Sequence, residues 1–337
     1  MHANMKVGII GGGRIGKLHA TNLTTCVSGV DIVAIADPYA DSALESWATE
    51  QGIPKVIKEY RGILSNSDVD AVLICSPTDT HASIIQEAAL AKKHIFCEKP
   101  LDQNPEVIRK TLKVVDRAKV VFQVGFNRRF DHNFRALRTA IVDGSIGDTH
   151  LLRITSRDPE PPSLEYIRTS GGLFMDMAIH DFDMARFLTG SEVVKVHAAG
   201  ATLVDPAIGR EGDIDTAVTT LWFDNGALGV IDNSRRATYG YDQRAEVFGS
   251  KGCASSCNDI PSSVRVCDAE GVRSEKPLFF FLDRYAASFA EELRDFVKAV
   301  NEGAEVPGAK AALNSVLIAH AAQKSLETGR PIDVEQG

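Results

Sequence analysis

Short apolar runs alternate with helical patterns through the first 125 residues. Five runs are rich in Val and Ile and are bounded by turn residues: Val7–Ile10, Ile32–Ala36, Ala71–Cys75, His94–Cys97 and Val120–Val124. Four segments between them have helical patterns: Gly16–Cys26, Asp41–Gln51, Thr80–Ala91 and Pro105–Ala118. Near-continuous apolar runs are typical of strands that are buried on both faces of a parallel sheet. The alternation therefore predicts a doubly wound α/β domain over residues 1–125.

The pattern changes after residue 125. Helical patterns cover His132–Val142, Gly172–Leu188, Tyr285–Asn301 and Lys310–Thr328, and longer strand patterns cover Val193–Val204, Thr216–Phe223, Ala227–Asn233 and Arg244–Gly249. Asp224-Asn225-Gly226 predicts a hairpin turn, because Asn-Gly tolerates the positive φ angles of tight turns. Residues 126–337 are thus predicted to form an α+β domain with a large, mostly antiparallel open sheet. The irregular stretch Asp158–Pro162 is predicted to be a loop near a site.

Composition and charge exclude several classes of partner. The 337 residues carry a net charge of −8 and no basic block, which argues against nucleic acid and anionic membrane surfaces. No apolar run approaches the roughly 20 residues that span a bilayer, and Met1–Lys6 lacks the layout of a signal peptide. Cys75 and Cys97 fall inside apolar runs, so we expect reduced, buried thiols and a cytoplasmic location. Cys253 and Cys257 have the spacing of a metal pair but no second pair nearby, so no metal site is expected.

The clearest binding motif is Gly11-Gly12-Gly13-Arg14-Ile15-Gly16, which follows the first strand and opens the first helix. Gly11 permits a tight turn, Gly13 lets the backbone approach a pyrophosphate, and Gly16 allows close helix–sheet packing. Arg14 and Ile15 complete the turn whose N–H groups face the phosphates. This is the Rossmann fingerprint in its required strand–turn–helix context.

Asp37 predicts the choice of cofactor. It ends the second strand, 21 positions after Gly16, which matches the usual spacing of about 20. A carboxylate there accepts from the ribose hydroxyls of the adenosine and repels a 2′-phosphate, and no Arg or Lys stands at positions 38–54. The sequence therefore predicts NAD rather than NADP.

Two further segments follow predicted strands, at the sheet edge where α/β domains bind ligands. The first contains Ser76, Thr78 and His81, and the second is Glu98-Lys99-Pro100. We expect these residues to contact the cofactor and Lys99 to take part in the reaction. His81 is open to two interpretations, direct chemistry or orientation of the Ser-Pro-Thr loop.

Asp176, His180 and Asp183 lie in a strongly apolar helical segment. At about 100° per residue they fall within an arc of roughly 60° on a single helix. Ionisable groups on a buried stripe are costly unless they line a cavity or pair with one another. A cavity with a proton-transferring His180 is the favoured interpretation, and a buried ion-pair network with Arg186 or a metal site are the alternatives.

Arg128 and Tyr239 are weaker candidates for substrate contacts. Arg128 follows the last strand of the first domain, where a guanidinium suits a polyhydroxylated or anionic substrate and a surface charge is the alternative role. Tyr239 lies in a strand connection of the second domain, where rim packing is the alternative role.

Together, these motifs resemble the glucose–fructose oxidoreductase/inositol dehydrogenase (Gfo/Idh/MocA) family. The residues that carry the resemblance are Gly11-x-Gly13-x-x-Gly16, Asp37, Ser76-Pro77-Thr78-x-x-His81, Glu98-Lys99-Pro100 and Asp176-x-x-x-His180. Within the family, Gly125–Asp131 and Met175–Asp183 look most like inositol 2-dehydrogenases of the myo/scyllo type. The segment Ser156-Arg157-Asp158-Pro159 lacks a histidine that some inositol dehydrogenases place there, which leaves the polyol open.

The resemblance implies an NAD-dependent dehydrogenase that oxidises a ring secondary alcohol of a cyclic polyol, and a homotetramer in the cytoplasm. It places Lys99, Asp176 and His180 at catalytic positions and Arg128, Asp183 and Tyr239 near the substrate. His180 is expected to accept the hydroxyl proton, Asp176 to hold the same hydroxyl, and Lys99 to stabilise the developing alkoxide. Another sugar as substrate, an NAD-dependent glycosidase of the same fold and a non-catalytic NAD-bound sensor are the alternatives.

Overall fold

The computed structural model describes residues 4–337. Residues 1–3 of the N-terminal segment Met1–Lys6 lie outside the described residues. The chain divides into two compact units, one of residues up to Asn127 with Ser288–Leu313, the other of Arg128–Ala287 with Asn314–Gly337. The sequence analysis placed a single division at residue 125 and did not foresee the return of the chain to the first unit. That return is α12 (Ala286–Glu302), whose Leu293 and Phe296 pack into the first core. The pattern of an amphipathic helix shows an apolar face, but not which core that face covers.

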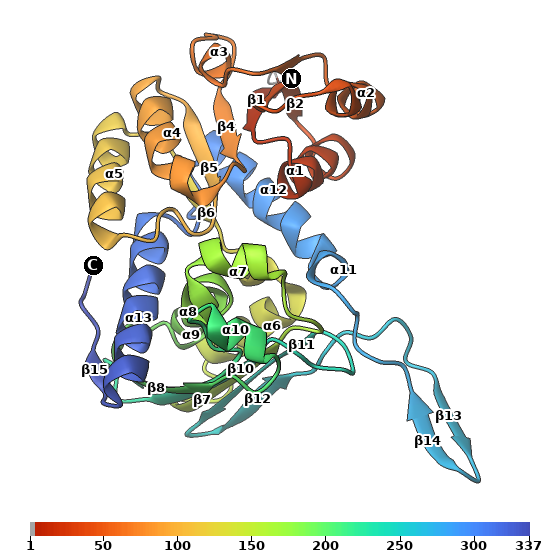
Figure 1. Ribbon diagram of the computed structural model, residues 1–337, viewed down its shortest axis with the longest axis vertical. Helices are drawn as coiled ribbons and strands as arrows, with labels where there is room; N and C mark the ends of the chain where they lie inside the picture. The colour runs from red at the N-terminus through yellow and green to blue at the C-terminus, as the bar shows by residue number, and fades with distance from the viewer. Residues whose placement is uncertain (1–3) are drawn as a thin grey trace. The chain divides into compact units, whose positions relative to one another are not determined.

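The first unit contains the predicted doubly wound parallel sheet (Figure 1). Its six strands lie in the spatial order β3-β2-β1-β4-β5-β6. The strand order reverses between β1 and β4, and ligands of such folds bind at this switch point. The strands are β1 (Met5–Ile10), β2 (Val30–Ala36), β3 (Val56–Ile57), β4 (Ala71–Ile74), β5 (His94–Glu98) and β6 (Phe122–Gly125). Five of the six were predicted, and the sequence analysis missed only the two-residue β3.

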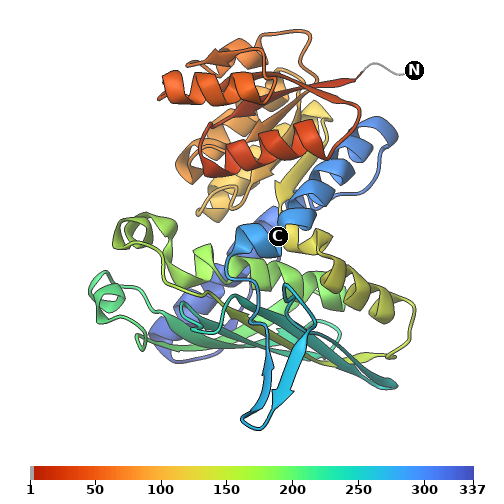
Figure 2. The same cartoon turned by 90° about the vertical axis from the view of Figure 1, so that its right-hand side faces the viewer.

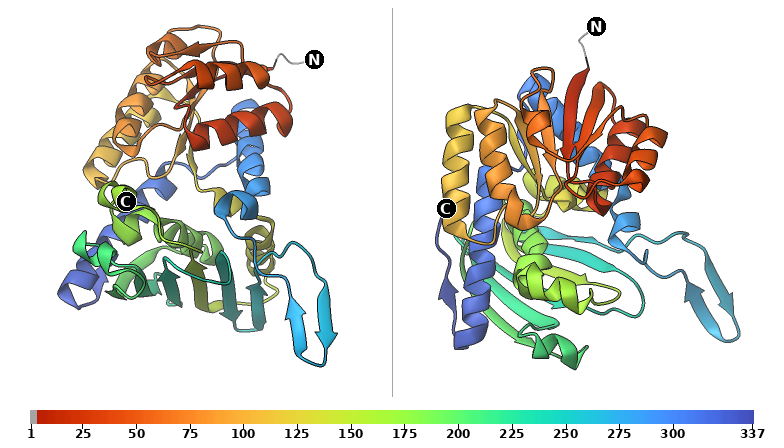
Figure 3. Two further views of the ribbon diagram at one scale, coloured as in Figure 1. Left: turned by 45° about the vertical axis from the view of Figure 1, so that its right-hand side comes forward. Right: turned by 45° about the horizontal axis from the view of Figure 1, so that its top comes forward.

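Helices cover both faces of this sheet. They are α1 (Arg14–Thr25), α2 (Ser42–Glu50), α3 (Arg61–Leu64), α4 (Thr78–Leu90) and α5 (Pro105–Ala118). Side chains of α1, α2 and α12 form one core with the strands, and α4 packs against α5 and β5. The right-hand view of Figure 3 shows α1 and α2 on one side of the sheet and α4 and α5 on the other.

The second unit contains a seven-stranded sheet in the order β12-β11-β7-β10-β9-β8-β15. Only β7 and β10 pair in parallel, which confirms the mostly antiparallel prediction. The strands are β7 (Thr149–Arg157), β8 (Val193–Ala201), β9 (Thr216–Phe223), β10 (Leu228–Ser234), β11 (Asp242–Gly249), β12 (Gly252–Ser256) and β15 (Ile332–Asp333). Gly226, in the predicted hairpin turn between β9 and β10, has a φ of +86°. The sequence analysis missed β7, a central strand whose exposed and buried positions alternate and give no continuous apolar run.

Helices α6, α9 and α13 lie on one face of this sheet (Figure 2). The helices of the second unit are α6 (His132–Val142), α7 (Leu164–Ser170), α8 (Gly172–Asp176), α9 (Ile179–Thr189), α10 (Pro206–Arg210), α11 (Phe281–Arg284) and α13 (Ala309–Thr328), and Asn127–Phe130 is a 3₁₀ turn. A small hairpin of β13 (Arg265–Asp268) and β14 (Gly271–Ser274) extends away from the sheet (Figure 1). Residues 158–163 contain neither helix nor strand, as predicted.

The prediction of a single helix over Gly172–Leu188 was wrong. The segment forms two helices, α8 and α9, separated at Met177 and Ala178. The amides of both residues donate to the carbonyl of Leu173, so the regular i to i−4 ladder is interrupted there. A continuous apolar pattern does not reveal such a break, because both helices bury the same kinds of side chain.

All six cysteines are free thiols, but they differ in exposure. Cys97 is buried, Cys75 is partly exposed, and the remaining four are exposed, including Cys253 and Cys257. No helix among residues 4–337 has the length and the hydropathy to cross a membrane.

Candidate active site

The glycine-rich turn between β1 and α1 has the backbone geometry of a phosphate cradle. Gly11 has a φ of +108°, and a Cβ on Gly16 would lie 1.9 Å from the carbonyl oxygen of Gly11. A Cβ on Gly13, in contrast, would have no atom of the described chain within 4 Å. Gly13 is also the N-cap of α1, with no side-chain cap, and the first turn of α1 contains no acidic residue. The turn is therefore rigid on its protein side and open at the N-terminus of α1, where a pyrophosphate binds.

Asp37 lies at the end of β2 and is oriented by backbone amides. Its Oδ2 accepts from the Gly12 N–H at 2.7 Å, and its Oδ1 accepts from the Tyr39 N–H at 2.8 Å. Each carboxylate oxygen keeps a second lone pair for a ribose hydroxyl. Asp37 is thus attached directly to the glycine-rich turn, and the residues of this end of the first unit fit an adenosine diphosphate group with a free ribose.

His81 orients two loops. Its Nδ1 lies 2.9 Å from the carbonyl oxygen of Pro100, and its Nε2 lies 2.8 Å from that of Ser76. The ring is buried, which favours the orienting role over direct chemistry. It connects the Ser76 loop, whose hydroxyl is 2.7 Å from that of Thr80, to the segment that carries Lys99. Thr78 is the first residue of α4.

Lys99 follows β5 directly and precedes Pro100 through a cis peptide bond. Its neighbour Glu98 is the last residue of β5 and pairs in register with Gly125 of β6. Lys99 is partly exposed at the carboxyl edge of the sheet, whereas Pro100 is buried. The first unit therefore presents Lys99 and the glycine-rich turn at the same sheet edge.

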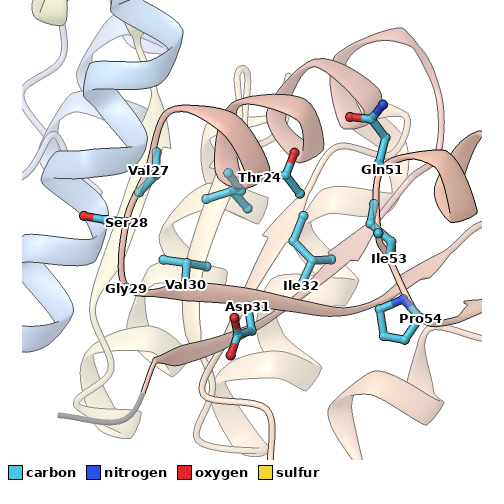
Figure 4. A pocket seen from close by; sticks show the side chains of 12 residues that line it. Thr24, Val27, Ser28, Gly29, Val30, Asp31, Ile32, Gln51, Ile53 and Pro54 are labelled. Carbon is cyan, nitrogen blue, oxygen red and sulfur yellow. The ribbon is translucent and has the colours of Figure 1, made fainter. Parts of the chain in front are cut away.

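A surface pocket of the first unit lies elsewhere. Figure 4 shows its lining side chains, which come from the end of α1, the start of β2 and the segment after α2, among them Thr24, Asp31 and Gln51. The start of β2 is the opposite end of the strand from Asp37. This pocket is therefore separate from the cofactor-binding edge.

In the second unit, Asp176 and His180 lie on either side of the break between α8 and α9. Asp176 is the last residue of α8, and His180 is the second residue of α9. Within residues 173–186 these are the two positions that are not buried. The predicted pair therefore reaches solvent from an otherwise buried segment, although a helix break, not one helical stripe, places it there.

Asp176 is held by two polar side chains. Tyr166 of α7 donates its hydroxyl to Oδ1 at 2.7 Å, and Arg235 lies 3.3 Å from Oδ2. Arg235 is 1% exposed and also reaches Asp213, so it is buried between two carboxylates. Tyr166 and Arg235, ten and 59 residues from Asp176, belong to no local motif and were not predicted from the sequence.

Asp158 is a further acidic residue that the sequence analysis did not assign to the site. Burial raises the pKa of Asp158 to about 7, an effect that Asp176 increases and that Arg235 and Arg128 oppose. Its backbone is fixed by hydrogen bonds with Ser234 and Ala237. A carboxyl group that exchanges its proton near neutral pH thus lies within electrostatic reach of Asp176.

Arg128 and Asp183 belong to buried ion pairs. Arg128 bonds to Asp181 at 2.5 Å and donates to the Tyr241 hydroxyl at 3.3 Å. Asp183 accepts two hydrogen bonds from Arg129, at 2.6 and 2.7 Å, and lies 3.9 Å from Arg186. For Asp183 the structure thus shows the ion-pair network that was the alternative interpretation, and its carboxylate is only 1% exposed.

Tyr239 is 40% exposed and is oriented by charged neighbours. Its hydroxyl donates to Asp242 at 2.6 Å and accepts from Arg157 at 3.1 Å. Burial and the bond to Asp242 raise its pKa, so the hydroxyl is neutral at physiological pH. The ring offers a polar and exposed edge on the second unit.

Comparisons with known proteins agree with this geometry. A family model described as an oxidoreductase family with an NAD-binding Rossmann fold matches residues 5–126, and a model of the GFO/IDH/MocA C-terminal domain matches residues 134–255. Myo-inositol 2-dehydrogenase of Thermotoga maritima is 48% identical and inositol 2-dehydrogenase of Rhizobium meliloti 45% identical, each over 98% of this chain and 99% of its own. The crystal structure of scyllo-inositol dehydrogenase from Lactobacillus casei with bound cofactor NAD(H) and scyllo-inositol is 31% identical and has a TM-score of 0.91. The match covers 98% of this chain and 99% of that chain.

Proposed function

The chain belongs to the GFO/IDH/MocA oxidoreductase family, and from this premise we propose that it oxidises a ring secondary alcohol of myo-inositol or a close cyclic polyol to a ketone. The observation that carries the proposal is the partly exposed pair Asp176 and His180 in a segment that is otherwise buried. The polyol is taken from the relatives that are named inositol 2-dehydrogenases and are 45–48% identical over nearly the whole chain.

The cofactor-binding residues proposed are those of the first unit's sheet edge. They are Gly11, Gly13, Arg14, Ile15, Gly16, Asp37, Ser76, Thr78, His81, Glu98 and Lys99. The open side of Gly13 and the two oriented oxygens of Asp37 support this assignment. NAD, when bound, supplies the hydride acceptor, and the protein supplies orientation and proton transfer.

In the proposed mechanism His180 accepts the proton of the reacting hydroxyl at a ring nitrogen. The Asp176 carboxylate helps to hold the substrate at the reacting hydroxyl and stabilises the imidazolium that forms on His180. Tyr166 and Arg235 hold the Asp176 carboxylate in place. Lys99 donates a hydrogen bond to the substrate oxygen as negative charge develops on it.

Tyr239 is the proposed substrate contact of the second unit, and Arg128 and Asp183 are proposed to support the substrate site. Tyr239 has the exposed edge that a direct contact requires. Arg128 and Asp183 are 4% and 1% exposed and are engaged in ion pairs, so we propose that they act by fixing the surrounding helices.

We also propose a homotetramer in the cytoplasm. Val218, Leu228 and Phe248 leave apolar side chains 43–49% exposed on three strands of the seven-stranded sheet, which suits packing of sheets against one another. The free thiols suit a reducing compartment. Sedimentation of the purified protein tests the tetramer directly.

A polyol panel with NAD⁺ tests the activity. Purified protein should produce NADH absorbance with myo-inositol or scyllo-inositol. Release of sugar from a glycoside without accumulation of NADH would instead indicate a glycosidase, and NAD binding without either reaction would indicate a sensor.

A further inference from the structure

Three ionisable side chains meet inside the first unit, and one of them belongs to the residue that precedes Lys99. They are His19 of α1, Glu98 at the end of β5 and Glu292 of α12. The potential ligand atoms of the three side chains all lie within 4.8 Å of one another. His19 and Glu292 are 0% exposed, whereas the Glu98 side chain is 17% exposed. The active-site chemistry described above does not use His19 or Glu292.

The hydrogen bonds of the cluster are unequal. His19 Nε2 lies 2.6 Å from Glu98 Oε1, a separation typical of a charge-assisted bond. Both carboxyl oxygens of Glu292 are buried and have no hydrogen-bond partner among the described residues. An ionised carboxylate in that position would have neither solvent nor donors, so the neutral acid is strongly favoured.

The surroundings of Glu292 also disfavour a second negative charge. The groups that face it are Glu98, His19 and the thiol of Cys75, while Cys97 lies near Glu98, and none of these is a fixed cation. Burial and the charge of Glu98 raise the pKa of Glu292 well above its usual value, and burial raises those of both thiols. The rings of Phe96 and Phe289 pack edge-on against His19 at centroid distances of 5.1 and 5.9 Å.

The cluster connects the two functional parts of the sheet edge. His19 is on the helix that begins at the glycine-rich turn, and Glu98 precedes Lys99 directly. There is little space around the Glu98 carboxyl group, since a Cβ on Gly125 would lie 3.2 Å from it. The bond from His19 therefore restricts Glu98, the residue before Lys99, and the bond from His81 restricts Pro100, the residue after it.

We propose that His19, Glu98 and Glu292 form a buried positioning array that carries one negative charge, on Glu98, with Glu292 as a neutral acid, and that this array places Lys99 for the reaction. This inference rests on the role proposed for Lys99. His19, Glu98 and Glu292 are positioning residues that act through Lys99, and His19 and Glu292 are not among the proposed cofactor contacts.

The charge state is tested by infrared difference spectroscopy on the full-length protein at neutral pH. The wild-type protein should show the carbonyl band of a protonated carboxyl group, and Glu292→Gln should remove it. Glu291→Gln, on the exposed side of the same helix, should leave the band in place and serves as the matched control. Persistence of the band in Glu292→Gln would overturn the assignment, as would a stoichiometric metal ion in the purified protein.

The positioning role is tested by kinetics. His19→Leu removes the donor to Glu98 and should lower kcat with the best polyol by about 10²-fold, because a small displacement of Lys99 misplaces its ammonium group. The NAD⁺ dissociation constant should stay within about two-fold, since the glycine-rich turn is retained. His19→Gln, which keeps a donor near the Nε2 position, should recover most of the loss, and Glu292→Gln should keep at least about half of kcat because it preserves a neutral group of the same shape.

Lys99→Ala separates the two hypotheses. If Lys99→Ala loses turnover while folded His19→Leu does not, the positioning array is refuted and the proposed mechanism survives. If Lys99→Ala keeps wild-type turnover, the proposed role of Lys99 fails first, whatever the infrared result. Equal loss of kcat in His19→Leu and His19→Gln would also refute the array, because a purely structural role does not depend on the donor.

Discussion

The two units prepare their functional groups in different ways. At the cofactor edge of the first unit, the groups that matter are mainly backbone N–H donors, and their positions depend on which residues lack a side chain. A Cβ added to Gly16 would lie 1.9 Å from the carbonyl oxygen of Gly11, whereas a Cβ added to Gly13 would have no described atom within 4 Å. In the second unit the groups are side chains, and the orientation of Asp176 depends on side chains outside its own helix. Asp176 depends on Tyr166 and Arg235, ten and 59 residues away.

This contrast shows where local sequence is sufficient. A site made of backbone groups is encoded by a few consecutive residues, so a substitution at one of them changes the site directly, through steric clashes. A side-chain site is encoded by the fold of the whole unit, so its properties depend on burial and on charge pairs that no short motif contains.

The largest effect is expected for His180→Ala. If His180 is the general base, its loss should lower kcat by about 10³-fold, within the range that general bases contribute. NAD⁺ affinity should remain unchanged, because every proposed cofactor contact belongs to the first unit. His150→Ala, an exposed histidine on β7, is the control. Wild-type turnover in folded His180→Ala would remove His180 from the mechanism and would suggest that chemistry in the second unit relies on other groups.

Much of the first unit could be predicted from the sequence. Five of its six strands, the sheet type and the positions of Gly11, Gly16 and Asp37 follow from apolar runs and spacing, because a parallel sheet is buried on both faces. The contribution of α12 to the first core could not be predicted, since an amphipathic pattern does not identify the partner of the apolar face. For the same reason His19 and Glu292 gave no signal: each is a single polar residue in a helix, and only the fold brings them to Glu98.

Less of the second unit could be predicted from the sequence. The spacing of Asp176 and His180 pointed to two residues that the structure leaves partly exposed, but the assumed continuous helix was wrong and Asp183 proved to be ion-paired with Arg129. The central strand β7 was missed because its alternating pattern gives no apolar run. Asp158 was missed as a titrating group, because its pKa depends on burial and on the charges of residues 18 and 77 positions away, Asp176 and Arg235.

A pair of glycine substitutions should separate sterics from binding in the first unit. Gly16→Ala places a Cβ against the Gly11 carbonyl, so it should lower the thermal unfolding temperature and weaken NAD⁺ binding about 10²-fold or more. Gly13→Ala should leave the unfolding temperature unchanged, because its Cβ points into open space, yet should still weaken NAD⁺ by about ten-fold as the pyrophosphate loses close approach. Calorimetry and thermal unfolding of both variants provide the measurement. Unchanged NAD⁺ affinity in Gly13→Ala would show that the open side of the turn does not face the cofactor.

A smaller effect is expected for cofactor preference. Replacing Asp37 by Ser and Pro38 by Arg removes the carboxylate that rejects a 2′-phosphate and supplies a guanidinium that pairs with it. The ratio of kcat/KM for NADP⁺ to that for NAD⁺ should rise by about 10- to 100-fold, the range of one or two good charged contacts. Because Asp37 also accepts from the Gly12 N–H, part of the NAD⁺ activity should be lost in the variant. A wild-type protein that prefers NADP⁺ at equal concentration would contradict the assigned role of Asp37.

The smallest effect should come from Asp158. Its pKa is raised to about 7 in the folded protein, above the ordinary value of 3.8, so folding favours its protonated form. The stabilisation is therefore complete below about pH 4 and is lost as the pH rises towards 7. Asp158→Asn cannot ionise, so its unfolding temperature should match that of the wild type near pH 4 and exceed it by about 2–4 °C at pH 8. Thermal unfolding across this range, with Asp148→Asn on the surface as the control, provides the comparison. A higher unfolding temperature for the wild type than for Asp158→Asn at pH 8 would contradict this prediction. It would mean that Arg235 stabilises the ionised carboxylate more than burial destabilises it, and Asp158 would then be a fixed anion of the site.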